Sequence, residues 1–217
     1  IDLARVKRVA KGHGVSLNDV VMALVAHALR EHLKRQNALP DEPLVVGMPI
    51  SLRGAGDGEA NNQVSMVQCP LPTEIADPLK RLQAIRAATA GIKTRVGALK
   101  DLIPTDFPGL AAPLWASGLS RLWSRGRISE RLPHLANLVI SNVPGPPIEL
   151  FLAGARVVHY YPISIVTHGL ALNVTVQSYG GHLEFGVISA RDVVERPETL
   201  ARAFERGLVA LERRLPA

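Results

Sequence analysis

Acid–base or nucleophilic chemistry in this 217-residue chain would have to use seven histidines and one cysteine. A histidine base needs a carboxylate to orient it, yet the sequence has no His-x-x-x-Asp or His-Glu-x-x-His spacing. It also lacks the Gly-x-Ser-x-Gly pattern that presents a nucleophilic serine. A single thiol, Cys69, provides neither a disulfide framework nor a cysteine-based metal site. The sequence therefore predicts no complete catalytic set and no metal.

The histidines also fall in ordinary positions. His13 lies in a turn, while His27 and His32 share a charged helix face, so we expect all three to be solvated. His168 interrupts an apolar strand region and is the least ordinary of the seven. A hydrogen-bonded core or turn histidine explains His168 without any catalytic role.

The composition is that of a folded domain, because 47% of the residues are hydrophobic and 20% are charged. The net charge of +6 favours anionic partners, namely nucleic acid, lipid headgroups or a phosphorylated co-substrate. Aromatic residues make up only 4%, so no nucleic acid is expected. The stretch 157–183 has no charged side chain but alternates with period two, which predicts buried strands and no transmembrane helix. One cysteine and no visible signal peptide fit a cytoplasmic location.

Hydrophobic periodicity predicts the α/β class, with a mixed β-sheet flanked by helices. Helices are expected from Ser16 to before Pro40, over 75–99 and 107–123, and from Pro197 at the first helical position onward. Strands are expected over 43–52, 63–71, 135–143, 156–161, 170–179 and 182–189. Gly180-Gly181 between the last two strands indicates a hairpin.

Four segments, in this order and spacing, resemble a known family. Val-Ser-Leu-Asn-Asp-Val-Val at 15–21 opens the first buried helix, and Pro-Ile-Ser-Leu-Arg at 49–53 closes a strand. Ile-Ser-Asn-Val-Pro-Gly-Pro at 140–146 closes a later strand, and 172–176 with 183–186 forms the final hairpin. Together they resemble the C-terminal domain of the bacterial wax ester synthase/diacylglycerol acyltransferase family over essentially the whole chain.

The resemblance implies that residues 1–217 are one C-terminal domain with a chloramphenicol-acetyltransferase-like fold. It implies acyl-CoA-dependent O-acyl transfer, in which a fatty alcohol or diacylglycerol attacks the thioester to give a wax ester or triacylglycerol. Acyl-CoA would be a co-substrate, and no cofactor is implied. The family's general base belongs to a His-His-x-x-x-Asp-Gly motif in an N-terminal domain. That motif is absent from this sequence, so the N-terminal domain would be this chain's partner.

Asn18 is the candidate for the catalytic centre. It offers a donor and an acceptor in the first turn of a helix, where the helix dipole favours developing negative charge. The alternative is that Ser16, Asn18 and Asp19 only cap a buried helix.

Six further polar residues are candidates for contact with the substrate or CoA: Ser16, Asp19, Ser51, Arg53, Asn142 and Asn173. Ser51 and Arg53 follow the end of a strand, where Arg53 either pairs with CoA phosphates or is solvated. The segment 142–146 either lines a tunnel or serves only as a rigid turn. Asn173, among apolar strand residues, is either functional or a hydrogen-bonded group at the edge of a strand ladder.

Arginines follow an apolar stretch in the middle of the chain. The predicted helix 107–123 contains Trp115, Trp123 and Arg121. It is followed by three more arginines, at 125, 127 and 131. This pattern indicates either peripheral attachment to a membrane or lipid-droplet surface, or packing against the partner domain. Two rival functions remain open from sequence: a non-catalytic lipid-binding module of the same fold, and a peptide-synthetase-like condensation component.

Overall fold

A five-stranded mixed β-sheet organises the protein. The computed structural model describes residues 1–51, 64–99, 136–166, 170–194 and 196–216. In the order β2-β1-β3-β6-β7, the strands are β1 (Leu44–Ser51), β2 (Val64–Leu71), β3 (Leu138–Val143), β6 (Leu172–Tyr179) and β7 (His182–Ser189). The central strands β1, β3 and β6 run parallel, and β2 and β7 pair antiparallel at the edges. The predicted mixed sheet is confirmed.

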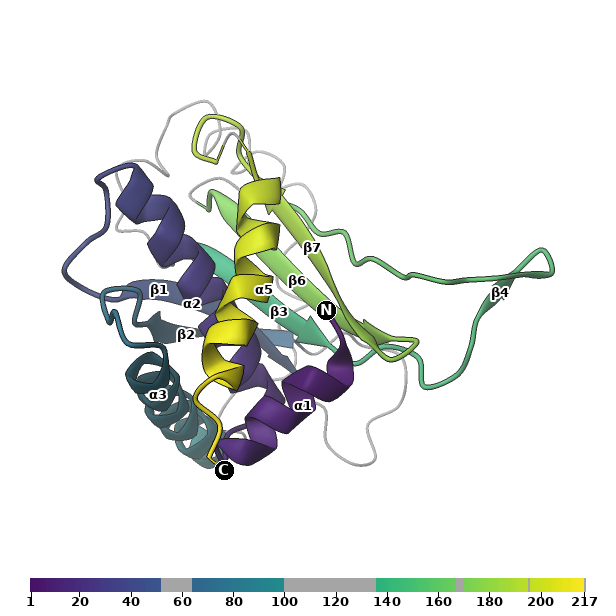
Figure 1. Cartoon of the computed structure of the whole chain (residues 1–217), viewed down its shortest axis with the longest axis horizontal. Helices are drawn as coiled ribbons and strands as arrows, with labels where there is room; N and C mark the ends of the chain where they lie inside the picture. Colours follow the sequence, from purple (N-terminus) through teal and green to yellow (C-terminus); the bar gives the residue numbers. More distant parts are fainter. Residues whose placement is uncertain (52–63, 100–135, 167–169, 195, 217) are drawn as a thin grey trace.

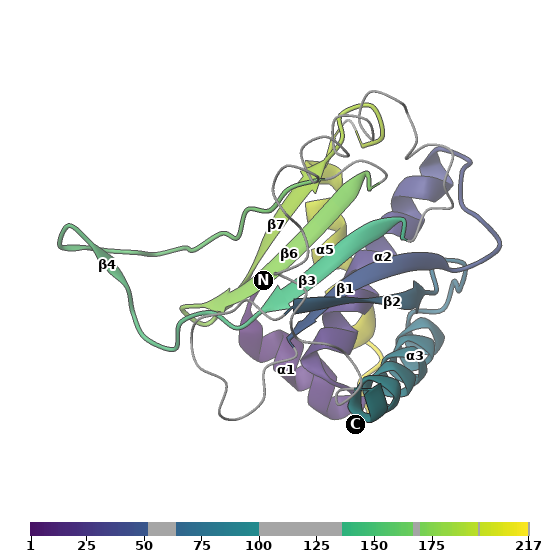
Figure 2. The same cartoon turned by 180° about the vertical axis from the view of Figure 1, so that it is seen from behind.

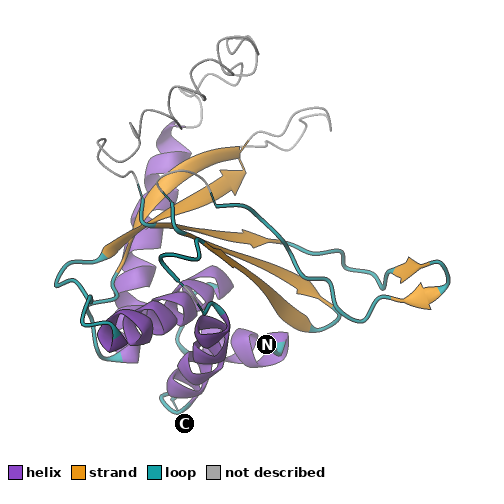
Figure 3. Cartoon of the chain, turned by 90° about the horizontal axis from the view of Figure 1, so that it is seen from above, coloured by secondary structure: helices purple, strands orange, loops and turns teal. Residues whose placement is uncertain are grey.

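The helices cover one face of this sheet. They are α1 (Leu3–Gly12), α2 (Leu17–Arg35), α3 (Pro78–Leu99) and α5 (Glu198–Glu212). In Figure 1 the helices lie in front of the strands, and from behind, in Figure 2, the strands lie in front of the helices. Seen from above, the marked N and C ends of the chain both lie on the helical side of the sheet (Figure 3). Among the described residues, the other face of the sheet carries no helix.

The central core helix is α2, which begins at a reciprocal cap. The Asp19 amide donates to Ser16 Oγ (3.2 Å), and the Ser16 amide donates to Asp19 Oδ2 (2.8 Å). Thr89 of α3 donates its hydroxyl hydrogen to the other Asp19 oxygen (2.7 Å). From Val20 onward most of the helix is buried, as its apolar composition predicts.

The predicted final helix is also confirmed. Leu200, Phe204, Leu208 and Leu211 of α5 are buried against α2 and the sheet. The helix begins at Glu198, so Pro197 stands one position earlier than predicted, at the N-cap. Boundary shifts of one residue are usual where a helix end has no side-chain cap.

The predicted strand over 156–161 is wrong. Arg156 belongs to a two-residue pairing between β4 (Phe151–Leu152) and β5 (Ala155–Arg156), at the tip of an arm that projects from the sheet (Figure 1). Residues 157–166, here called the strap, return without strand pairing. Their period-two pattern arises because alternate side chains point toward and away from the sheet. Ile163 and Ile165 are 84% and 71% exposed, and Ser164 between them faces the sheet.

A buried arginine lies between α2 and α3. Arg81 is only 2% exposed, and its Nη1 donates to the carbonyl of Ile75 (2.6 Å) while its Nη2 lies 3.2 Å from His27 Nδ1. Burial, together with the charge of Arg30, lowers the pKa of Arg81 to about 10. The expectation that His27 is solvated is wrong, because Gly207 of α5 packs against its ring and leaves the side chain 17% exposed.

Stability should fall in mild acid because of His27. Burial lowers its pKa below the ordinary 6.5, and Arg81 and Arg206 add to this, although Glu31 opposes it from 3.0 Å. The folded protein then binds fewer protons than the unfolded chain, so the stabilisation is full above pH 6.5 and is lost as the pH falls through the folded-state pKa. We expect Tm to drop more on acidification in the wild type than in His27→Gln. Each unit by which the pKa of His27 differs between the folded and the unfolded protein is equivalent to about 1.4 kcal/mol of unfolding free energy. Equal slopes in the two proteins would contradict this role for His27.

The predicted helix 107–123 and the loop 54–58 lie outside the described residues. Within the ranges that are described, no helix is long and apolar enough to cross a membrane.

Candidate functional site

The helix-free face of the sheet, here called the open face, carries a cavity of about 350 Å³. Along β3, Leu138 and Ile140 point into the helical core, so Val139 and Ser141 point to the open face. The same alternation along β6 places Asn173 and Thr175 there. The cavity is lined by Pro49, Met66, Val139, Ser141, Ile163, Ser164, Ile165, Leu170, Leu172, Asn173 and Thr175.

Asn173, one of the predicted site residues, lies in the wall of this cavity. Its amide nitrogen donates to Ser164 Oγ and to the carbonyl of Ile165, both at 3.1 Å. Its oxygen accepts a hydrogen bond from Thr175 (2.9 Å). Asn173 is 6% exposed and its hydrogen bonds hold the strap beside the cavity, so it shapes the site through the strap.

Three more contacts hold the strap to the sheet. Tyr179 donates its hydroxyl hydrogen to the carbonyl of Val157 (2.9 Å). His159 Nδ1 lies 2.8 Å from the buried Glu184 carboxylate of β7. Gly186 lets the strap lie directly on β7, because a Cβ at this position would overlap the Pro162 carbonyl.

The His159–Glu184 pair was missed by sequence reasoning. The two residues are 25 positions apart, which matches no acid–base motif. The pairing depends on the path of the strap, where a strand had been predicted. No local signal in the sequence could have found it.

Asn18 lies in the first turn of α2 and is not among the described residues that line the open-face cavity. Its amide nitrogen lies 3.7 Å from the Met22 sulfur, which is a weak acceptor. This contact therefore contributes little to holding the Asn18 side chain in place. Its neighbours Ser16 and Asp19 are fully engaged in the helix cap. The structure therefore does not bring Asn18 together with Asn173.

The other candidates lie where the parallel strands end. Ser51 is the last residue of β1, and Asn142 is exposed near the end of β3. Since β1 and β3 are parallel, these ends share one edge of the sheet. Arg53 lies outside the described residues. Ser141, which the sequence reasoning passed over, lines the cavity instead of Asn142; its alternation with the apolar Leu138 and Ile140 is the signal that could have found it.

The described residues that line the cavity offer hydroxyl and amide groups, and none of them is a titratable base. Within the described parts of the chain, no three His, Cys, Asp or Glu side chains converge as metal ligands. The arrangement can bind and orient a substrate or stabilise developing charge, and a base would have to come from elsewhere.

Comparisons with known proteins show that the chain corresponds to a part of longer proteins. The chain is 41% identical over 211 residues to a Mycobacterium tuberculosis protein provisionally named diacylglycerol O-acyltransferase, covering 97% of this chain and 46% of that protein. It is 36% identical to the O-acyltransferase WSD of Acinetobacter baylyi, covering 97% of this chain and 44% of that one. The chain thus spans about half the length of these relatives.

Solved structures show the same relationship. The wax ester synthase/diacylglycerol acyltransferase of Marinobacter aquaeolei VT8 superposes with a TM-score of 0.73 at 30% identity, covering 99% of this chain and 47% of that one. The epimerization domain of a tyrocidine synthetase module, at 13% identity and a TM-score of 0.56, shares the fold alone. Residues 60–212 match the WS/DGAT C-terminal domain family. The chain belongs to the WS/DGAT C-terminal domain family.

Proposed function

We propose that this chain is the C-terminal half of an acyl-CoA-dependent O-acyltransferase that makes wax esters or triacylglycerol. The observation that carries the proposal is its alignment, over nearly its whole length, with about half of each O-acyltransferase relative. The experiment that tests it is reconstitution of acyl transfer from the two halves, set out at the end of the Discussion.

The proposed partner is an N-terminal domain that carries His-His-x-x-x-Asp-Gly and covers the open face. Large hydrophobic side chains are exposed on the arm, the strap and the open face: Met66, Val143, Ile148, Phe151, Leu152, Val158, Tyr160, Tyr161, Ile163 and Ile165. An apolar surface of this extent marks an interaction site. Its continuity with the cavity supports a substrate tunnel between the two halves.

In the proposed reaction the partner's histidine removes the proton from the alcohol hydroxyl. The hydroxyl oxygen attacks the thioester carbonyl of acyl-CoA, and the carbonyl oxygen becomes an oxyanion. The tetrahedral intermediate collapses to the ester and releases the CoA thiolate, which takes the proton. Acyl-CoA is a co-substrate here, and the reaction needs no bound cofactor.

This chain would supply polar groups to that reaction. Asn18 donates a hydrogen bond to the developing oxyanion, and the Ser16–Asp19 cap fixes the start of its helix. Ser51, Arg53 and Asn142 contact substrate or CoA at the edge where the parallel strands end. Asn173 shapes the cavity through the strap.

We further propose that the segment 107–131 attaches the protein to an anionic membrane or lipid-droplet surface. The support is compositional, since four arginines lie at or just beyond the end of an apolar stretch with two tryptophans. The protein should float with vesicles that contain phosphatidylglycerol, and Arg→Glu changes at 121, 125, 127 and 131 should abolish flotation. Flotation that survives these changes would contradict electrostatic attachment.

A further inference from the structure

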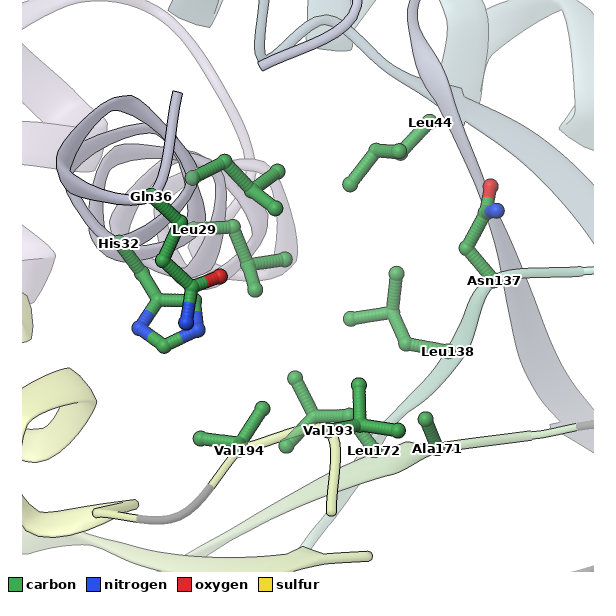
Figure 4. A pocket seen from close by; sticks show the side chains of 11 residues that line it. Leu29, His32, Gln36, Leu44, Asn137, Leu138, Ala171, Leu172, Val193 and Val194 are labelled. Atoms are coloured by element: carbon green, nitrogen blue, oxygen red, sulfur yellow. The ribbon is translucent and has the colours of Figure 1, made fainter. Parts of the chain in front are cut away.

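A second cavity, of about 270 Å³, lies on the helical side of the sheet. It is formed at the edge where the parallel strands begin, by Leu44 of β1, Leu138 of β3 and Leu172 of β6. The last two turns of α2 and the segment after β7 close it on the other sides. The full lining is Leu29, His32, Leu33, Gln36, Leu44, Asn137, Leu138, Ala171, Leu172, Val193 and Val194 (Figure 4).

The walls of this pocket are aliphatic. Leu138, Leu172 and Val194 are almost completely buried, so the wall is made of ordered core side chains. Val193 forms part of the rim and is 51% exposed. A well-formed apolar pocket of this kind binds apolar ligands in preference to water.

The polar side chains among the described lining residues are one imidazole and two amides. His32 and Gln36 lie side by side on one wall in Figure 4. Burial and the neighbouring Arg35 lower the pKa of His32, so its imidazole is neutral at physiological pH. The oxygen of Asn137 accepts a hydrogen bond from the Val45 amide (2.7 Å), which fixes that side chain. The described residues of the lining include no Lys, Arg, Asp or Glu side chain to pair with a charged ligand.

We propose that this pocket binds one unbranched aliphatic chain that ends in an uncharged hydroxyl group, with the hydroxyl hydrogen-bonded to His32 or Gln36. The site is separate from the cavity on the open face, although Leu172 contributes to both linings. Occupancy of the pocket does not depend on the acyltransferase assignment, because its walls belong entirely to this chain.

Calorimetric titration of the chain with 1-hexanol, 1-octanol and 1-decanol, all below their solubility limits, tests the proposal. Each added methylene should strengthen binding about fourfold until the pocket is full. Decanoate should bind at least about tenfold more weakly than 1-decanol, because its carboxylate loses hydration without gaining a cation.

Two variants locate the site. Val193→Trp fills the rim of the pocket and should weaken 1-decanol binding at least about tenfold. Val158→Trp adds the same ring at another exposed valine, on the strap and outside the pocket, and should leave binding unchanged. Non-saturable binding, equal binding of decanoate, or equal affinity in Val193→Trp and the wild type would each overturn the proposal.

Discussion

Replacing Asn18 with alanine in the complete two-domain enzyme should lower kcat about a hundredfold and change KM little. A hydrogen-bond donor aimed at developing charge acts mainly in the transition state, and loss of one such donor costs about 3 kcal/mol. Among the described residues, this amide nitrogen has the Met22 sulfur, a weak acceptor at 3.7 Å, as its hydrogen-bond partner, so it can still donate to a substrate. Steady-state kinetics with palmitoyl-CoA and hexadecanol measure the effect.

Two companion variants separate this role from helix capping. Asn18→Asp keeps the shape but replaces the donor with a carboxylate, so kcat should fall at least as far. Ser16→Ala removes the cap and should cost about 1 kcal/mol of unfolding free energy while kcat is retained. A normal kcat in Asn18→Asp would end the oxyanion role and leave Asn18 as a structural residue.

Local patterns were enough to predict most of the fold. The capping residues at 16 and 19 and the apolar run after them fix α2 without tertiary information. Gly180 and Gly181 adopt φ of +54° and +82°, which the two-residue hairpin turn requires. Such features depend on neighbours a few positions apart, so a single sequence displays them.

The open-face site depends on contacts between distant segments. The strap alternates like a strand, yet it makes no strand ladder: the Val157 amide donates to the Leu150 carbonyl, and other polar groups of the strap bond to the side chains of Asn173, Tyr179 and Glu184. His27 is predicted to be solvated because its helix neighbours are charged, but Gly207 of α5 and Arg81 of α3 pack against it and bury it. Residue types identified Asn173, but its role in holding the strap needed the tertiary structure.

The purified 217-residue chain alone should show no acyl transfer above background. None of the described residues that line the cavity is a base, and loss of a general base costs about two to four orders of magnitude in rate. Circular dichroism should first establish that the isolated chain is folded, so that inactivity reports on missing chemistry.

The most direct measurement is transfer of labelled palmitate from palmitoyl-CoA to hexadecanol by the chain mixed with the polypeptide encoded upstream of Ile1. The account predicts activity from the mixture and none from either half. It also predicts that alanine at both histidines of the upstream His-His-x-x-x-Asp-Gly motif abolishes the restored activity while the two halves still bind each other. Transfer by the chain alone, a folded and associated pair without activity, or an upstream sequence without this motif would contradict the account.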